Sequence, residues 1–111
     1  MIIKICKDFS ETPGARYKTE GKYSGEEFRD TILKPAFIKC NQQGEPLILD
    51  LDGGYGYPTS FLEEAFGGLA REFGEEKVNS ILKFISNDEP SLEGEIRKYI
   101  LLSKERKNEK K

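Results

Sequence analysis

Short apolar runs alternate along the chain with longer stretches in which apolar residues recur every three or four positions. The runs at 1–6, 47–52 and 78–86 are bounded by turn-forming residues, which predicts strands. A further short strand is predicted at 16–19. These runs together indicate a sheet of about four strands.

The longer stretches predict three helices. The first begins at Ser24, which opens a Ser-x-x-Glu capping box, and reaches about residue 39 with a kink at Pro35. The second begins at Ser60, the N-cap of an identical pattern, and stops at Gly74. The apolar face of the third helix consists of Leu92, Ile96, Tyr99 and Ile100.

Alternation of strands and helices is typical of an α/β fold with an open sheet and parallel neighbours. We therefore expect one α/β domain at 1–103, with a small mixed or parallel-cored sheet and helices packed against it. Residues 104–111 are rich in charge and predict a disordered C-terminal tail.

Composition excludes several kinds of chemistry. The 111 residues contain no histidine, so neither a Ser-His-Asp or Cys-His catalytic centre nor a histidine-ligated metal is possible. Cys6 and Cys40 form no Cys-x-x-Cys motif, which favours reduced thiols and a cytoplasmic location. No apolar run is long enough to span a membrane. We expect no metal and no cofactor.

The net charge of −2 is unevenly distributed. Residues 1–103 carry 13 basic and 18 acidic side chains, a net charge of −5. An acidic body disfavours contact with a phosphate backbone, so nucleic acid is not an expected partner.

The glycine-rich loop at 53–60 lies between a predicted buried strand and a predicted helix, which is where open α/β sheets place their sites. A phosphate cradle lacks support because residues 46–70 contain no Lys or Arg. A cation site from Asp50 and Asp52 is opposed by their alternation across a strand. Ser60 is either a structural N-cap or a phosphoacceptor on a partner-binding loop.

A second candidate is the turn-rich loop at 8–17. There Arg16 could hold a phosphate or carboxylate in a bidentate contact, or it could pair with a nearby acid such as Asp8. This loop supports an alternative function, a small protein or enzyme that binds an anionic ligand. Its candidate ligand-binding residues are Asp8, Ser10, Thr12, Gly14 and Arg16.

Four stretches carry a resemblance to a known family: DFSETPGARY at 8–17, SGEEFR at 24–29, LILDLD at 47–52 and TSFLEEAFGGL at 59–69. Together they make the chain similar to an uncharacterised family of STAS-like domains over about residues 1–100. More distantly, 47–69 resembles the signature stretch of STAS-domain anti-sigma factor antagonists.

The resemblance implies a regulatory protein without catalysis of its own, which binds a GHKL-type ATPase with serine kinase activity or another signalling partner. By position the phosphoacceptor would be Ser60, with Thr59 beside it. The better-known members carry Asp-Ser-Ser-Gly here, whereas this chain has Pro-Thr-Ser-Phe at 58–61. Tyr55 and Tyr57 would anchor the partner, unless they serve only to cover the sheet edge. The predicted partner-binding residues are Gly53, Gly54, Tyr55, Gly56, Tyr57, Pro58, Phe61 and Glu64.

Overall fold

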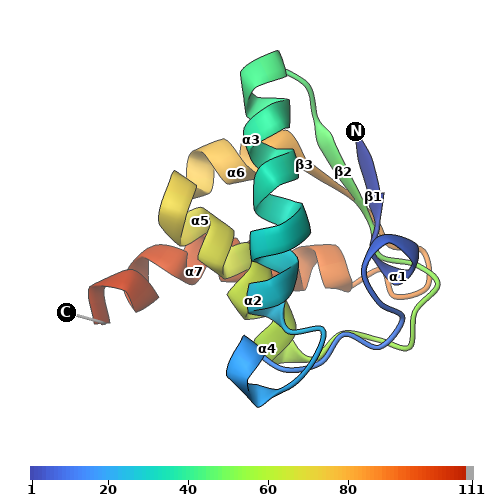
Figure 1. The fold of residues 1–111 in the computed structure, drawn as a ribbon. Helices are drawn as coiled ribbons and strands as arrows, with labels where there is room; N and C mark the ends of the chain where they lie inside the picture. Colours follow the sequence, from blue (N-terminus) through green and yellow to red (C-terminus); the bar gives the residue numbers. More distant parts are fainter. Residues whose placement is uncertain (110–111) are drawn as a thin grey trace.

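The computed structural model describes residues 1–109 and contains one sheet of three parallel strands in the order β1-β2-β3. The strands are β1 (Ile2–Lys4), β2 (Leu47–Asp50) and β3 (Leu82–Ile85). In Figure 1 they lie together at one side of the body, and the long helices occupy the other side. The predicted α/β class with parallel neighbours is confirmed.

The first long helix is continuous from residue 25 to 43 and consists of α2 (Gly25–Phe28), the π-helical turn η2 (Arg29–Leu33) and α3 (Lys34–Gln43). The Ser24 hydroxyl accepts the Glu27 N–H at 3.0 Å, which confirms the predicted cap. The helix passes Pro35 because the wider turn of η2 immediately precedes it. It ends at Gly44 in the left-handed conformation, further along than predicted.

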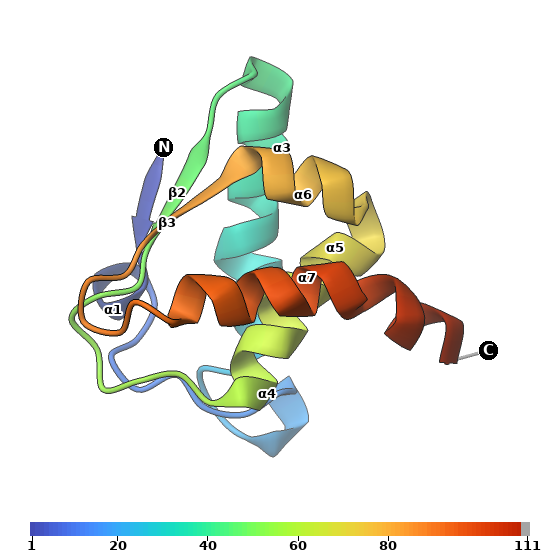
Figure 2. The same cartoon turned by 180° about the vertical axis from the view of Figure 1, so that it is seen from behind.

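The second long helix covers residues 59–73 as α4 (Thr59–Leu62), the π-helical turn η3 (Glu63–Gly67) and α5 (Gly68–Phe73). Beyond Gly74 lies α6 (Glu75–Ile81), and the final helix is α7 (Leu92–Glu109). Figure 2 shows α7 running across the back of the body, with its C-terminal end projecting from it.

Two predicted strands differ in the structure. Residues 16–19 form no strand, because the Glu20 carboxylate accepts the backbone N–H groups of Arg16 and Tyr17 and a 3-10 turn, η1 (Lys18–Glu20), follows. The predicted strand at 78–86 is helical up to Ile81. Its helix begins with two acidic residues, Glu75 and Glu76, which the helix dipole favours in a first turn. The described residues therefore form three strands rather than about four.

The backbone is helical through residue 109, past the predicted boundary at 103. Residues 110 and 111 of the predicted disordered tail lie outside the described residues. None of the helices in the described part of the chain is long and apolar enough to cross a membrane.

The core lies between the inner face of the sheet and the helices. The side chains of Ile3 and Leu49, on neighbouring strands, are buried against them. The largest fully buried side chains are Phe28, Phe37, Phe61, Phe66, Ile5, Leu33, Leu47, Leu49, Leu62, Leu69, Leu82 and Ile96. Most of them come from the two long helices and β2, so these elements set the positions of the loops between them.

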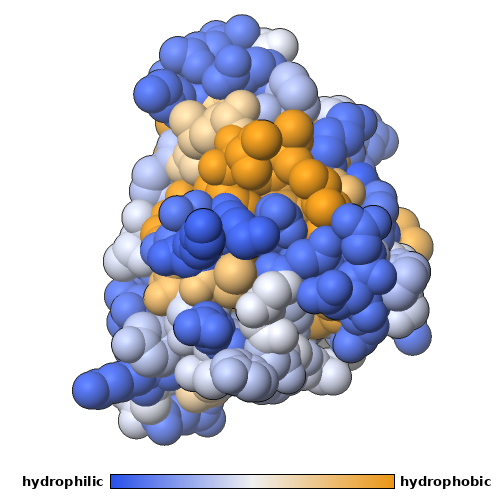
Figure 3. Space-filling model, turned by 90° about the vertical axis from the view of Figure 1, so that its right-hand side faces the viewer, coloured by the Kyte–Doolittle hydropathy of each residue, from blue (hydrophilic) through white to orange (hydrophobic). Residues whose placement is uncertain are grey.

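Within residues 1–109, no helix covers the outer face of the sheet. Ile2 pairs in register with Ile48 and is 62% exposed, and Ile85 on β3 is also exposed. Figure 3 shows this side of the molecule, where an apolar patch is crossed by a hydrophilic band. Lys4 and Asp50 form an ion pair of 3.3 Å on this face. Parallel sheets are usually covered on both faces, whereas this sheet leaves one face open to solvent.

Candidate functional site

The two loops that the sequence offers as competing sites lie against each other. The Tyr55 N–H donates to the Glu11 carbonyl at 3.0 Å. A β-carbon at Gly54 would lie 3.2 Å from the same oxygen, so only glycine permits this approach without displacement. The glycine-rich loop is therefore fastened to the 8–17 loop, and the two candidates form one surface.

A shallow cavity of about 330 Å³ lies where the two loops meet. We call it the tyrosine–proline hollow, and its lining consists of Thr12, Pro13, Tyr55, Gly56, Tyr57 and Pro58. No charged side chain contributes to this lining. The sequence patterns assigned Thr12 and Tyr55 to different sites, because no local pattern records that the two loops touch.

The two tyrosines of the hollow have different environments. The Tyr57 hydroxyl donates to the Leu51 carbonyl at 2.8 Å, and burial raises the pKa of this phenol strongly. Tyr57 thus lines the hollow with its ring, and its hydroxyl already has a hydrogen-bond partner. Tyr55 is 84% exposed. Of the two predicted anchors, Tyr57 therefore has a clear structural role, and Tyr55 is the one that solvent fully reaches.

Hydrogen bonds at the strand ends fix the start of the glycine-rich loop. Asp52 accepts the backbone N–H groups of Asn87 and Asp88 at 2.8 and 2.9 Å, which lowers the pKa of its carboxyl. The Gly53 N–H donates to the Asp88 carboxylate at 2.9 Å. Gly53 has a φ of 92°, a conformation that favours glycine. Asp52 therefore fastens two loops together. Among the described side chains, no group of three or more could hold a metal ion.

The helix after the loop begins two residues earlier than predicted. Its N-cap is Pro58, without a side-chain cap, and Thr59 and Ser60 occupy the first two helical positions. The prediction of Ser60 as N-cap is therefore wrong. Proline holds the extended conformation that precedes the first turn, so no side-chain cap sets the boundary. Thr59 is exposed and Ser60 is half-buried.

Thr59 is connected to α7. Its hydroxyl lies beside that of Tyr99, and the Tyr99 hydroxyl donates to Glu95 at 2.6 Å. Burial raises the pKa of Tyr99, and the hydrogen bond to Glu95 acts in the same direction. The exposed hydroxyl at the helix start thus lies at one end of a short chain of polar contacts that leads to a carboxylate.

Five charged side chains below the loops form what we call the arginine–glutamate network. Arg16 pairs with Glu63, and the second oxygen of Glu63 accepts from Arg71 at 2.7 Å. Glu64 accepts from Arg29 at 2.7 Å and lies 3.6 Å from Arg16. All five side chains are at most 22% exposed. The network holds the 8–17 loop against η3.

This network corrects two expectations. Arg16 pairs with Glu63 rather than Asp8, whose carboxylate accepts the Lys4 N–H instead. Although burial opposes its charge, the hydrogen bond to Glu63 and the charge of Glu63 raise the pKa of Arg16 overall. Arg16 is therefore engaged within the fold. Glu64, predicted to contact a partner, is 6% exposed.

Several other predicted residues have structural roles. Phe61 is fully buried, so it cannot belong to an exposed contact surface. The Ser10 hydroxyl accepts the Thr12 N–H at 2.9 Å, and the Gly14 N–H donates to the Tyr23 carbonyl at 3.0 Å. Tyr55, Gly56, Tyr57 and Pro58 remain together in the hollow, joined by Thr12 from the other predicted set.

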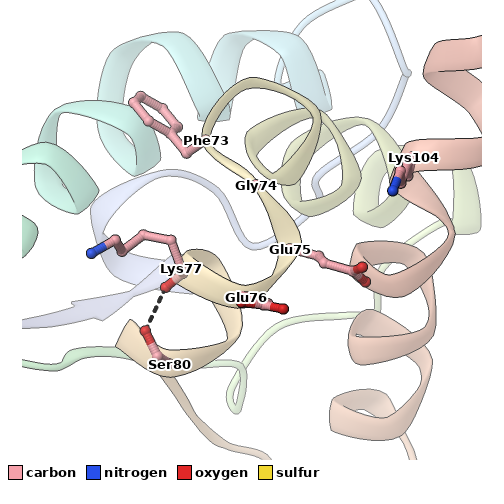
Figure 4. A pocket seen from close by; sticks show the side chains of 7 residues that line it. All are labelled: Phe73, Gly74, Glu75, Glu76, Lys77, Ser80 and Lys104. Atoms are coloured by element: carbon pink, nitrogen blue, oxygen red, sulfur yellow. Dashed lines mark hydrogen bonds between the residues drawn. The ribbon is translucent and has the colours of Figure 1, made fainter.

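A larger cavity lies away from these loops, beside α6. It has a volume of about 630 Å³ and is lined by Phe73, Gly74, Glu75, Glu76, Lys77, Ser80 and Lys104. Figure 4 shows its charged side chains spread around the rim, with Lys77 and Glu76 pointing in different directions. The Ser80 hydroxyl donates to the Lys77 carbonyl. Because its polar groups do not converge, this cavity offers no catalytic or binding arrangement.

A family model described as a STAS-like domain of unknown function matches residues 24–92, more than half of the chain. The matched region contains Tyr55–Pro58 of the hollow and the start of α4, whereas Thr12 and Pro13 lie before it. No curated protein and no solved structure matches the chain.

Proposed function

The chain belongs to the family of STAS-like domains of unknown function, and from this premise we propose that it is a cytoplasmic regulatory module without catalysis that binds a signalling protein. The contact surface is the tyrosine–proline hollow together with the start of α4. The observation that carries the proposal is Tyr55, a large amphipathic side chain that is 84% exposed on a loop fastened to its neighbours. Tyrosines in such positions commonly supply the energetic centre of a protein interface.

The arrangement favours the binding of a protein partner over the binding of a small anionic ligand. The 8–17 loop offers Arg16 as its cation for an anionic ligand, and that guanidinium pairs with Glu63 in the fold. The hollow itself is uncharged and shallow, as expected of a surface that receives a side chain rather than a small anion. The distant resemblance to anti-sigma factor antagonists supports a GHKL-type ATPase with serine kinase activity as the class of partner.

Modification of the helix start would regulate this surface. Thr59 is exposed and Ser60 half-buried at the first two helical positions, directly after the hollow's Pro58. A phosphate on Thr59 would interact favourably with the helix dipole but would crowd Tyr99, whose hydroxyl donates to the Glu95 carboxylate. The added negative charge would therefore loosen the contact between α4 and α7 beside the hollow.

A site-specific crosslinking experiment tests the proposal. A photoreactive benzophenone amino acid replaces Tyr55 in cells that produce the protein, and the matched control carries it in place of Leu101, which is 61% exposed on α7. We expect a discrete adduct from position 55 that position 101 does not give. Adding Thr12→Arg, which brings a charge to the rim of the hollow, should abolish it. Identical adducts from both positions, or none from position 55, would contradict the proposal.

The regulatory step has its own test. In the crosslinking strain, Thr59→Asp and Ser60→Asp should each reduce the adduct from position 55, whereas Thr59→Val and Ser60→Ala should leave it. A full-strength adduct from both aspartate variants would rule out control by charge at this helix start while leaving the binding surface intact.

A further inference from the structure

The chemistry of the tyrosine–proline hollow restricts what it can bind. Its wall contains the rings of Tyr55, Tyr57, Pro13 and Pro58, and Gly56 adds no side chain. The Tyr57 hydroxyl is already hydrogen-bonded to the Leu51 carbonyl, so this residue offers its ring. A surface of aromatic and proline rings without charge favours an apolar, ring-shaped group over a charged or amide side chain.

The shape of the hollow favours an extended segment. At about 330 Å³ it lies near the lower end of the range of about 300–1,000 Å³ that is typical of small-molecule pockets, and it is open rather than enclosed. A polyproline II helix suits such a surface, because it has no internal hydrogen bonds and projects its rings along an extended line. Its preformed backbone also reduces the ordering entropy lost on binding to an aromatic-lined groove.

The charges around the hollow add a second requirement. Glu11 is exposed and directly precedes Thr12 of the lining, and Asp88 is exposed where its carboxylate accepts the Gly53 N–H. Residues 46–70 contain no Lys or Arg. A segment that crosses the hollow would thus meet the exposed Glu11 next to Thr12, and a carboxylate complements a basic side chain.

We propose that the tyrosine–proline hollow recognises a proline-rich segment in the polyproline II conformation, flanked by basic residues, on the partner protein. This inference rests on the proposed function, since it names the chemistry by which the same surface recognises its partner. Tyr55 stacks on a proline ring of the segment, Tyr57 and Pro58 form the floor of the contact, and Glu11 faces a basic residue at the segment's end.

Peptide titration tests this recognition with the full chain. The ligand is a fluorescent oligoproline peptide that begins with two arginines, and the control peptide carries the same arginines before alternating glycine and serine. We expect saturable binding of the oligoproline peptide alone, by fluorescence anisotropy. Amide chemical-shift changes should concentrate at Thr12, Tyr55, Gly56 and Tyr57, the lining residues that possess an amide proton.

Two matched variants locate the contact. Tyr55→Ala should weaken binding of the oligoproline peptide by about tenfold or more, as expected when the anchor of a contact is removed. Leu101→Ala removes another exposed side chain, on α7, and should leave binding unchanged. Equal binding of both peptides, or shifts that map to the open sheet face, would overturn the proposal.

Peptide titrations at low and high salt concentration test the requirement for basic residues separately. In about 1 M salt the Debye length falls to about 3 Å, so the arginine-bearing peptide should bind no better than one with serines in place of the arginines. If the two peptides bind equally at low salt, the requirement for basic residues is refuted. A crosslinked adduct at position 55 without peptide binding would refute the proline-rich partner and leave the proposed interaction module intact. If neither the adduct nor peptide binding is observed, both proposals are refuted.

Discussion

The α-carbon of Gly25 faces the backbone carbonyl of Phe61, and a β-carbon at position 25 would lie 2.6 Å from that oxygen. The same β-carbon would meet the Ala65 nitrogen at 3.2 Å. The obstacles are backbone atoms of the second long helix and the Glu64 β-carbon attached to it, which cannot move independently of the core. Gly25 therefore sets the distance at which α2 crosses α4.

Gly25→Ala should consequently lower the free energy of unfolding by about 1–3 kcal/mol, the usual cost of forcing an extra methyl group into a packed contact. The matched control is Gly94→Ala in α7, where a β-carbon would meet no atom within 4 Å. That substitution should stabilise the protein by about 0.5–1 kcal/mol through helix propensity. Thermal and urea denaturation measure the change in the free energy of unfolding of each variant. Equal changes would contradict the close approach of α2 to α4 at Gly25.

The Arg29–Glu64 pair should contribute much more to stability than an exposed pair. Its side chains are 15% and 8% exposed, so Glu64→Gln would leave a largely buried guanidinium with only the more distant Asp30 carboxylate at 3.9 Å, and should destabilise the protein by about 3–5 kcal/mol. Replacing both residues, as Arg29→Met with Glu64→Leu, should cost less than Glu64→Gln alone.

Lys18 and Asp30 provide the control for that comparison. They pair at 2.9 Å but are 49% and 42% exposed, so Lys18→Ala should cost less than about 1 kcal/mol. Urea denaturation of the three variants would contradict the buried network if Glu64→Gln and Lys18→Ala had similar effects.

The two serines of the apparent capping boxes should behave differently. Ser24 is buried and accepts the Glu27 N–H, so Ser24→Ala should destabilise the protein by about 1 kcal/mol. Ser60 caps nothing, and Ser60→Ala should remain within about 0.5 kcal/mol of the wild type. Melting temperatures measure both effects, and a larger loss at Ser60 than at Ser24 would mean that the second helix begins at Ser60 after all.

Asp52 should affect the acid limb of the stability profile. Hydrogen bonds from Asp88 and Asn87 lower the pKa of its carboxyl from the usual 3.8, so its charged form favours the folded state. This contribution is fully present above pH 3.8 and disappears as the pH falls through the lower folded-state pKa. Asp52→Asn keeps an acceptor oxygen but removes the charge. It should lower the melting temperature at neutral pH and reduce its dependence on pH in the acid range, and an unchanged acid profile would argue against this role.

Local patterns predicted the parts of the fold that local physics determines. The cap at Ser24 and the central strand at Leu47–Asp50 follow from side chains within a few residues of one another. The α/β class follows from their alternation, and the resemblance to STAS-like domains is confirmed by the family match.

The errors occurred where contacts distant in sequence decide the outcome. Arg16 and Glu63 are 47 residues apart, and no pattern within either loop shows that they pair. The spacing of Ser60 and Glu63 suggested a capping box, whereas Glu63 pairs with two arginines in the fold. The tyrosine–proline hollow was missed as a unit for the same reason, because the contact between Glu11 and Tyr55 joins loops that are far apart along the chain.

The open outer face of the sheet affects how the protein behaves in concentrated solution. Ile2 is already 62% exposed in the folded state, so its replacement by a polar residue gives up little burial and should change folding energy only slightly. An apolar patch of this kind nevertheless promotes contact between molecules. The isoleucines on this face therefore influence solubility and shelf stability more than they influence the fold.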